Sequence, residues 1–123
     1  MRRMTVTEFH AALTAQGVSS REHLALICPL CGVVQSAQDL IDAGAGGDFD
    51  SVEPMLGFSC VGRWTGAPGP RERADGQPCN WTLGGLFRLH QLEILTDDGK
   101  AHPRFLPASP EQAQQHEAAR VPA

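Results

Sequence analysis

The stretch Cys28-Pro-Leu-Cys-Gly32 decides how this chain folds, because it places two thiols three positions apart across a tight turn. Pro29 stiffens that turn, and Gly32 can adopt the positive φ that the backbone needs as it folds back under a metal ion. The preceding run His23–Ile27 is typical of a strand that leads into such a turn, and Val33 and Val34 would return antiparallel to it. The stretch therefore predicts a zinc knuckle.

Two further cysteines complete a set of four thiols. Cys60 and Cys79 each stand within two residues of Gly or Pro. We predict that one structural Zn²⁺ is held in a tetrahedral site by Cys28, Cys31, Cys60 and Cys79. The spacing departs from a regular zinc ribbon, because 18 residues separate the last two cysteines. A redox-active pair and two disulfides remain alternatives, although no βαβ pattern surrounds the first pair.

Composition limits the classes of protein that fit this sequence. A length of 123 residues suits one domain, and 13 Gly with 9 Pro make it rich in loops, so a metal cross-link would matter for stability. The net charge of −4 argues against a general nucleic-acid coat. No apolar stretch is long enough to span a membrane, and the amino end lacks the apolar core of a signal peptide. We expect a cytoplasmic protein, because in a reducing compartment thiols stay reduced and four cysteines favour metal over disulfides.

The pattern of elements predicts a small α+β domain, similar to a zinc ribbon or a treble clef, with short helices and a C-terminal β-hairpin. Capping residues and apolar spacing predict helices over 6–16, 37–43 and 51–56. A short strand is expected over 58–61. A strand over about 86–96, bulged near His90, is expected to turn at Asp98-Gly99 and pair with an edge strand at 101–106.

The domain is expected to span residues 1–108 and to be followed by a weakly ordered tail, 109–123. Ser109 and Pro110 have the features of a helix start. The residues after them show no large apolar face, and a helix this short is marginal alone. Removing the tail is therefore expected to leave thermal stability nearly unchanged.

The long segment 62–78 is the predicted partner-binding loop. Seven of its seventeen residues are Gly or Pro, and Cys60 and Cys79 would fix its two ends. Its local charge is +1 in an acidic chain. The candidate partner-binding residues are Arg63, Trp64, Arg71, Arg73 and Arg88. The plainer alternatives are that the loop is a solvated insertion, that the tryptophan packs over the metal site, and that Arg63 and Arg88 donate to the thiolates.

The sequence favours a non-enzymatic protein. Four thiolates close a zinc site and leave no position for a substrate or a reactive water. A zinc deaminase needs His-x-Glu ahead of its Cys-x-x-Cys, and that pattern does not occur in this chain. A metal-dependent nuclease remains an alternative, for which Asn80 and His90 are the nearest candidates.

Three stretches carry a resemblance to a known group of proteins. They are Cys28-Pro-Leu-Cys-Gly-Val-Val-Gln-Ser, Gly57-Phe-Ser-Cys-Val-Gly-Arg-Trp and Pro78-Cys-Asn-Trp-Thr-Leu-Gly-Gly-Leu-Phe-Arg. Over about residues 24–107 the chain resembles small uncharacterised proteins of bacteriophages, prophages and plasmids. The resemblance implies a mobile-element origin and retention of the four cysteines. Accessory phage proteins of this size often bind a host protein, including defence systems, or nucleic acid.

We therefore expect an accessory protein that binds a host or phage protein and that modulates host defence. The alternative is a nucleic-acid-binding zinc module that uses the arginines of the 62–78 loop.

Overall fold

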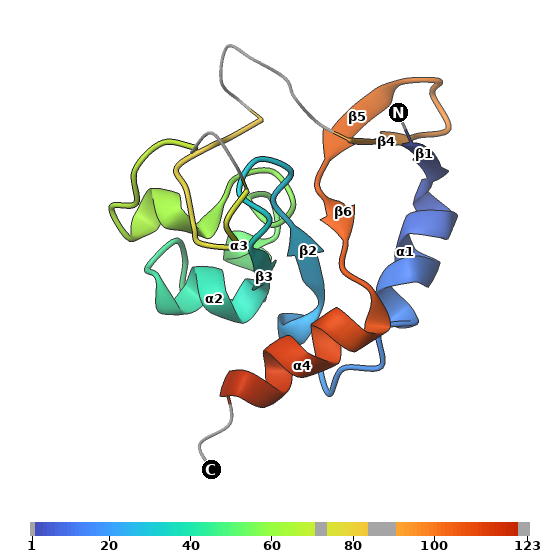
Figure 1. Cartoon of the computed structure of the whole chain (residues 1–123). Helices are drawn as coiled ribbons and strands as arrows, with labels where there is room; N and C mark the ends of the chain where they lie inside the picture. Colours follow the sequence, from blue (N-terminus) through green and yellow to red (C-terminus); the bar gives the residue numbers. More distant parts are fainter. Residues whose placement is uncertain (1, 71–73, 84–90, 121–123) are drawn as a thin grey trace.

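Two three-stranded sheets form the framework of this α+β chain in the computed structural model, which describes residues 2–70, 74–83 and 91–120. Helix α1 lies on one side of the sheet formed by β3, β2 and β6, and helices α2 and α3 lie on the other side (Figure 1). Helix α4 lies below this sheet in the view, near the carboxyl terminus of the chain. In chain order the described elements are β1 Arg2–Thr5, α1 Val6–Thr14, the 3-10 helix η1 Arg21–His23, β2 Ala25–Ile27, β3 Val34–Ser36, α2 Ala37–Asp42, α3 Phe49–Val52, the 3-10 helix η2 Val61–Trp64, β4 Leu92–Leu95, β5 Ala101–Arg104, β6 Leu106–Pro107 and α4 Pro110–Arg120.

The first sheet has the strand order β1-β4-β5. Strands β4 and β5 form the predicted antiparallel hairpin, with Gly99 at a φ of +81° in its turn. Strand β5 is an edge strand, as the proline at 103 indicated. Strand β1 pairs parallel to β4, with Met4 opposite Ile94, and the sequence did not predict it. This strand is short and largely exposed and includes two arginines, so its sequence shows no alternation of apolar and polar residues.

The second sheet has the order β3-β2-β6, with β2 in the centre. Strands β2 and β3 pair antiparallel across the knuckle, as predicted. The expected strand 101–106 is wrong as a single element, because the chain changes sheets at Phe105. The Phe105 ring is fully buried, and its backbone N–H donates to the Gly57 carbonyl at 2.7 Å. The chain therefore leaves β5 and joins β2 as β6.

Capping side chains set the helix starts. Thr5 and Glu8 form a capping box at α1, and Ser36 and Asp39 form one at α2. Helix α3 begins at Phe49 rather than at residue 51, because the Asp48 carboxylate accepts from the Ser51 N–H and caps it earlier. The prediction of a strand over 58–61 is wrong as well.

Within residues 58–61 the described strand pairing is a single isolated bridge, between Ser59 and Thr82. Residues from Val61 on turn into η2, which carries the chain away from its partner segment. The part of the predicted strand 86–96 that lies before residue 91 is outside the described residues. The described part begins at Leu92.

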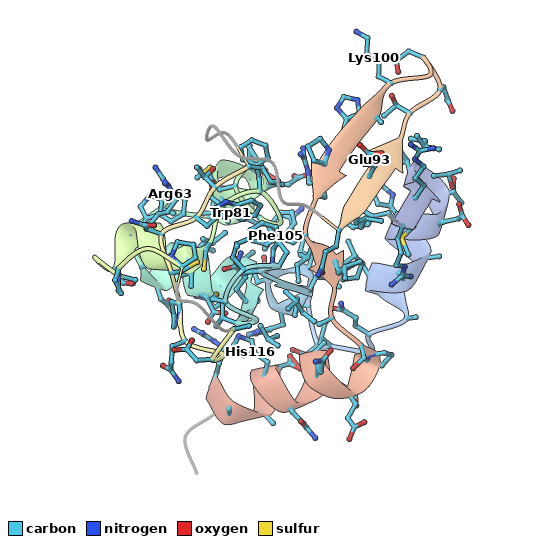
Figure 2. All side chains as sticks on the ribbon, turned by 45° about the horizontal axis from the view of Figure 1, so that its top comes forward. Arg63, Trp81, Glu93, Lys100, Phe105 and His116 are labelled. Atoms are coloured by element: carbon cyan, nitrogen blue, oxygen red, sulfur yellow. The ribbon has the colours of Figure 1, made fainter. Side chains whose placement is uncertain are left out.

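The main core surrounds the cysteines. All four belong to one buried cluster with the side chains of Leu26, Leu40, Val52, Leu83 and Phe105. Trp81 stacks on Phe105 at 5.9 Å between ring centroids and 17° between planes (Figure 2). Trp81 therefore packs against the core that contains the cysteines.

Helix α4 lies within residues 109–123, the segment predicted to be a weakly ordered tail. Ser109 and Gln112 form a capping box at its start, and Ala113 is fully buried. The Gln114 amide donates to the Gln16 carbonyl at 2.8 Å, and the Ser19 N–H donates to the Glu117 carboxylate at 3.0 Å. Apart from Ala113, mainly polar contacts hold this helix, so its sequence shows no large apolar face.

At its far end α4 contacts α2 through charge. His116 donates to the Asp39 carboxylate, and Arg120 pairs with both Asp39 and Asp42. Burial raises the pKa of Asp39, but the His116 and Ser36 hydrogen bonds and the Arg120 charge outweigh it and hold the pKa below its usual range. A carboxylate with a depressed folded-state pKa stabilises the fold above its unfolded-state pKa of roughly 4. This contact is therefore lost only as the pH falls below that value.

These contacts reverse the expectation for the tail. We expect removal of residues 109–123 to lower the melting temperature by at least about 5 °C, because roughly 1 kcal/mol corresponds to several degrees in a domain of this size. The deletion leaves the Gln16 carbonyl and the Asp39 carboxylate without their α4 partners. Differential scanning calorimetry measures the shift. Gln115→Ala, on the exposed side of α4, is the control and should melt with the parent; an unchanged truncated chain would show that α4 contributes nothing.

Candidate metal centre

Four sulfur atoms meet in the core. The Sγ atoms of Cys28, Cys31, Cys60 and Cys79 all lie within 4.8 Å of one another. The Cys28–Cys79 separation is 3.9 Å and the Cys31–Cys60 separation is 3.7 Å. Each cysteine is at most 1% exposed. A tetrahedral metal ion with four thiolates at about 2.3 Å sets its sulfurs roughly 3.8 Å apart, so this donor set fits such an ion.

The first pair of cysteines is positioned by the knuckle turn. The Cys28 N–H donates to the Val33 carbonyl at 3.1 Å, and the Gly32 N–H donates to the Cys28 carbonyl at 2.9 Å. Gly32 has a φ of +79°, which a side chain would strain. Both thiols therefore lie on the inside of one closed turn at the end of the β2–β3 hairpin.

The second pair comes from two segments that lie opposite each other. The Cys60 N–H donates to the Trp81 carbonyl at 2.9 Å, and the Ser59 and Thr82 hydroxyls lie 2.7 Å apart. The Leu83 N–H donates to the Phe58 carbonyl at 2.9 Å. These contacts form a short antiparallel pair in which the loop 62–78 replaces a tight turn.

The described ends of that loop are tied to the cysteine cluster. An added Cβ at Gly62 would lie 2.2 Å from the Cys79 carbonyl oxygen, so only glycine fits there. Arg63 donates to the Asn80 carbonyl at 2.8 Å, which joins the two ends of the loop. The Gly76 N–H donates to the Cys31 carbonyl at 2.7 Å, which fixes the loop to the knuckle.

Backbone N–H groups point at the sulfurs in a repeated pattern. The backbone groups of Leu30, Gly62 and Trp81, each two residues after a cysteine, act to lower the pKa of Cys28, Cys60 and Cys79 in turn, and the Cys31 backbone does the same at Cys28. The Cys79 N–H also donates to the Cys60 sulfur at 3.4 Å. Such donors stabilise thiolate charge, as the surroundings of a metal–thiolate site must. Backbone groups therefore fill the role that the sequence analysis gave to Arg63, whose guanidinium bonds a carbonyl instead.

The thiols influence one another strongly. Hydrogen bonding to Cys28, together with the backbone donors, lowers the pKa of Cys60 to about 5. Interaction with Cys60, and then burial, raises the pKa of Cys28, and burial raises that of Cys79 to about 12. Ionising one sulfur therefore opposes ionising the others. A bound cation is what would allow four thiolates in one place.

A buried glutamine braces the cluster, and the sequence analysis missed it. Gln35 has no exposed surface; its amide donates to the Ser59 carbonyl at 3.1 Å and accepts from the Val61 N–H at 2.8 Å. Strand β3 is thereby joined to the residues on both sides of Cys60. The only available signal was a glutamine directly after Val33 and Val34, next to the knuckle.

The structure brings together the four predicted metal ligands. Of the predicted partner-binding residues, Arg63 is exposed and bonded to Asn80 (Figure 2). Trp64 is half-buried against the core. Arg71, Arg73 and Arg88 lie outside the described residues. Binding by any of these five side chains stays a prediction.

Comparison with known proteins identifies a matching family. The model of a protein family described as VVA0879-like matches residues 5–108. Neither the curated proteins nor the solved structures include a significant match to this chain. In the described ranges, no helix has the length and apolar character needed to cross a membrane.

The buried glutamine yields a prediction about the centre. We expect Gln35→Leu to destabilise the fold by at least about 2 kcal/mol, because it leaves the buried Ser59 carbonyl and Val61 N–H unpaired beside Cys60. Urea denaturation of the metal-loaded protein measures the free energy of unfolding. The same substitution at Gln38, whose side-chain partner within the described residues is the exposed Asp42, is the control and should cost far less. Equal losses for the two variants would contradict the bracing role.

Proposed function

The chain belongs to the VVA0879-like family, whose description names no activity, and we propose its function from the cysteine centre. It is a non-enzymatic binding module whose fold depends on one structural Zn²⁺ held by Cys28, Cys31, Cys60 and Cys79. The observation that carries this proposal is the burial of all four sulfurs within 4.8 Å of one another.

Zinc is favoured over other metals by the donor set and by the surroundings. Four thiolates in tetrahedral geometry suit Zn²⁺, and structural zinc sites use this ligand set widely. An iron ion with the same ligands would act in electron transfer, and the metal analysis described below distinguishes iron from zinc. The antiparallel turns that carry the two pairs support a relation to zinc ribbons or treble clefs.

The enclosed centre supports a binding role over catalysis. Four cysteines would fill every coordination position, and the cluster has almost no exposed surface through which a substrate could reach the metal. A metal in this place would link the knuckle to residues 60 and 79 and would stabilise the surface around them.

We propose a protein as the partner, in the cytoplasm of a bacterial host. The net charge of −4 opposes binding along a phosphate backbone. The loop 62–78 carries a local charge of +1, and its described ends are tied to the cysteine cluster, which suits a loop presented to an acidic protein face. The phage, prophage or plasmid origin that the sequence resemblance implies makes a host protein, including a defence protein, the expected partner.

The metal proposal predicts one Zn²⁺ per chain. Any single Cys→Ser change in the cluster should lower that ratio, and a strong chelator should unfold the domain, since structural zinc contributes on the order of 10 kcal/mol. Elemental analysis and far-UV circular dichroism measure the two effects. His102→Ala removes an imidazole, a side chain of a type that can bind metal, from outside the cluster and should keep the ratio. A folded protein with two disulfides and no metal would refute the proposal.

The partner proposal predicts that Arg71→Glu with Arg73→Glu weakens capture of a host protein at least tenfold while zinc content stays the same. Affinity capture from host lysate, followed by titration with the purified partner, measures it. Arg2→Glu with Arg3→Glu makes the same charge change on β1 and is the control. Capture that survives both the loop double variant and replacement of the loop by a few Gly and Ser would place the binding face elsewhere. Salt-dependent retention on DNA or RNA, without a protein partner, would favour the nucleic-acid alternative.

A further inference from the structure

A cavity of about 520 Å³ lies away from the cysteines, among α1, α3 and β5. Its volume is within the range of pockets that enclose small organic ligands. Its walls are mainly apolar side chains from α1, from the residues of β2 and just before it, and from α3 and the turn after it. These side chains are Phe9, Leu13, Leu24, Leu26, Phe49 and Leu56.

One cationic side chain of this apolar pocket has no anionic partner among the residues that the structure describes. Arg104 is half-buried, and its guanidinium carbon lies 5.4 Å from the centre of the Phe58 ring. Its described hydrogen bond goes to the carbonyl of the adjacent Pro103, at 2.8 Å. In the described ranges no carboxylate pairs with it, whereas Arg3, Arg21 and Arg120 all have such partners.

The position of Arg104 is fixed by the backbone around it. The Phe105 N–H bonds the Gly57 carbonyl at 2.7 Å, and a Cβ added at Gly57 would lie 3.8 Å from the Arg104 Cδ and 2.8 Å from a Leu26 methyl. The arginine stem therefore packs closely at the base of the pocket. A guanidinium has five N–H donors, and only one of them is used here by a described acceptor.

The other charged groups of the pocket narrow the choice of ligand. His10 lines this pocket and also a smaller cavity of about 280 Å³, which shares Phe9 and Arg104 with it. Two carboxylates, Asp50 and Glu53, also line the larger pocket, and Asp50 lies 3.9 Å from Arg21. A strongly charged anion such as a phosphate would be repelled by these carboxylates. A single carboxylate at the Arg104 end, joined to an apolar body, meets each of these constraints.

We propose that this pocket binds a small amphipathic monocarboxylate. The carboxylate accepts hydrogen bonds from the Arg104 guanidinium, and the apolar body lies among the side chains from α1 and α3. Burial of an unpaired guanidinium is costly unless an anion completes it, and burial lowers the pKa of Arg104. The planar fork of the arginine matches a carboxylate in two parallel hydrogen bonds.

The test uses the zinc-loaded full-length chain and three probes with the same eight-carbon chain: octanoate, 1-octanol and octyltrimethylammonium. Titrations followed by two-dimensional NMR give affinity and location together. We expect octanoate to bind at least about tenfold more tightly than the other two and to shift the signals of Phe9, Leu24 and Phe49. Arg104→Gln should remove that preference while 1-octanol binds as before. Arg2→Gln, an exposed arginine on β1, should bind octanoate like the parent.

Each contrary result has a defined meaning. Equal binding of octanoate and 1-octanol, or octanoate binding that Arg104→Gln does not weaken in a variant with an unchanged NMR fold, would overturn the proposal. Signals of Phe9 and Leu24 that shift with protein concentration alone would show that a second copy of the chain fills the pocket, and the proposal would be wrong. None of these results depends on whether a partner protein binds the loop 62–78.

Discussion

The fold is arranged around four sulfur atoms that lie within 4.8 Å of one another in the core. As neutral thiols they pack like small apolar groups, but only a cation between them allows all four to be charged at once. The cluster joins a local turn, Cys28–Cys31, to two distant residues, and it closes intervening segments of 28 and 18 residues. In a chain with 13 Gly and 9 Pro, few other contacts could offset the entropy of ordering such loops.

Two buried glutamines add further connections between separate segments of the chain. Gln16 both donates to and accepts from the backbone of Ala25, at 2.8 Å in each direction, and it also donates to the Ala108 carbonyl at 3.0 Å. Gln35 makes the corresponding pair of bonds to Ser59 and Val61. Each side-chain amide therefore pairs with backbone N–H and carbonyl groups as a neighbouring strand would, because its oxygen accepts and its NH2 group donates in one plane. Short sheets of two to four residues per strand gain an additional partner in this way.

Local chemistry made part of this structure predictable from sequence. The knuckle hairpin, the capping boxes at Thr5 and Ser36 and the turn at Asp98-Gly99 all depend on residues a few positions apart. The clustering of the four thiols also followed from their number and the turn residues beside them. Strand β1, the change of sheet at Phe105 and the docking of α4 depend instead on partners about 50 to 100 residues away. Strand β1 is largely exposed and α4 is held mainly by polar contacts, so hydrophobic periodicity gave no signal for either, and the single buried Phe105 does not indicate which sheet the chain joins.

The apolar pocket and the cysteine centre share structural elements, although apolar side chains and Arg104 line the first and four thiols form the second. Leu26 lines the pocket two residues before Cys28, and Leu56 lines it four residues before Cys60. Arg104 is held by Phe105, which is buried in the same core cluster as the four sulfurs. The walls of the pocket are therefore set by the backbone that the cluster holds in place. Any ligand that binds the assembled pocket and not the unfolded chain must stabilise the assembled centre as well, because both require the same packing around β2.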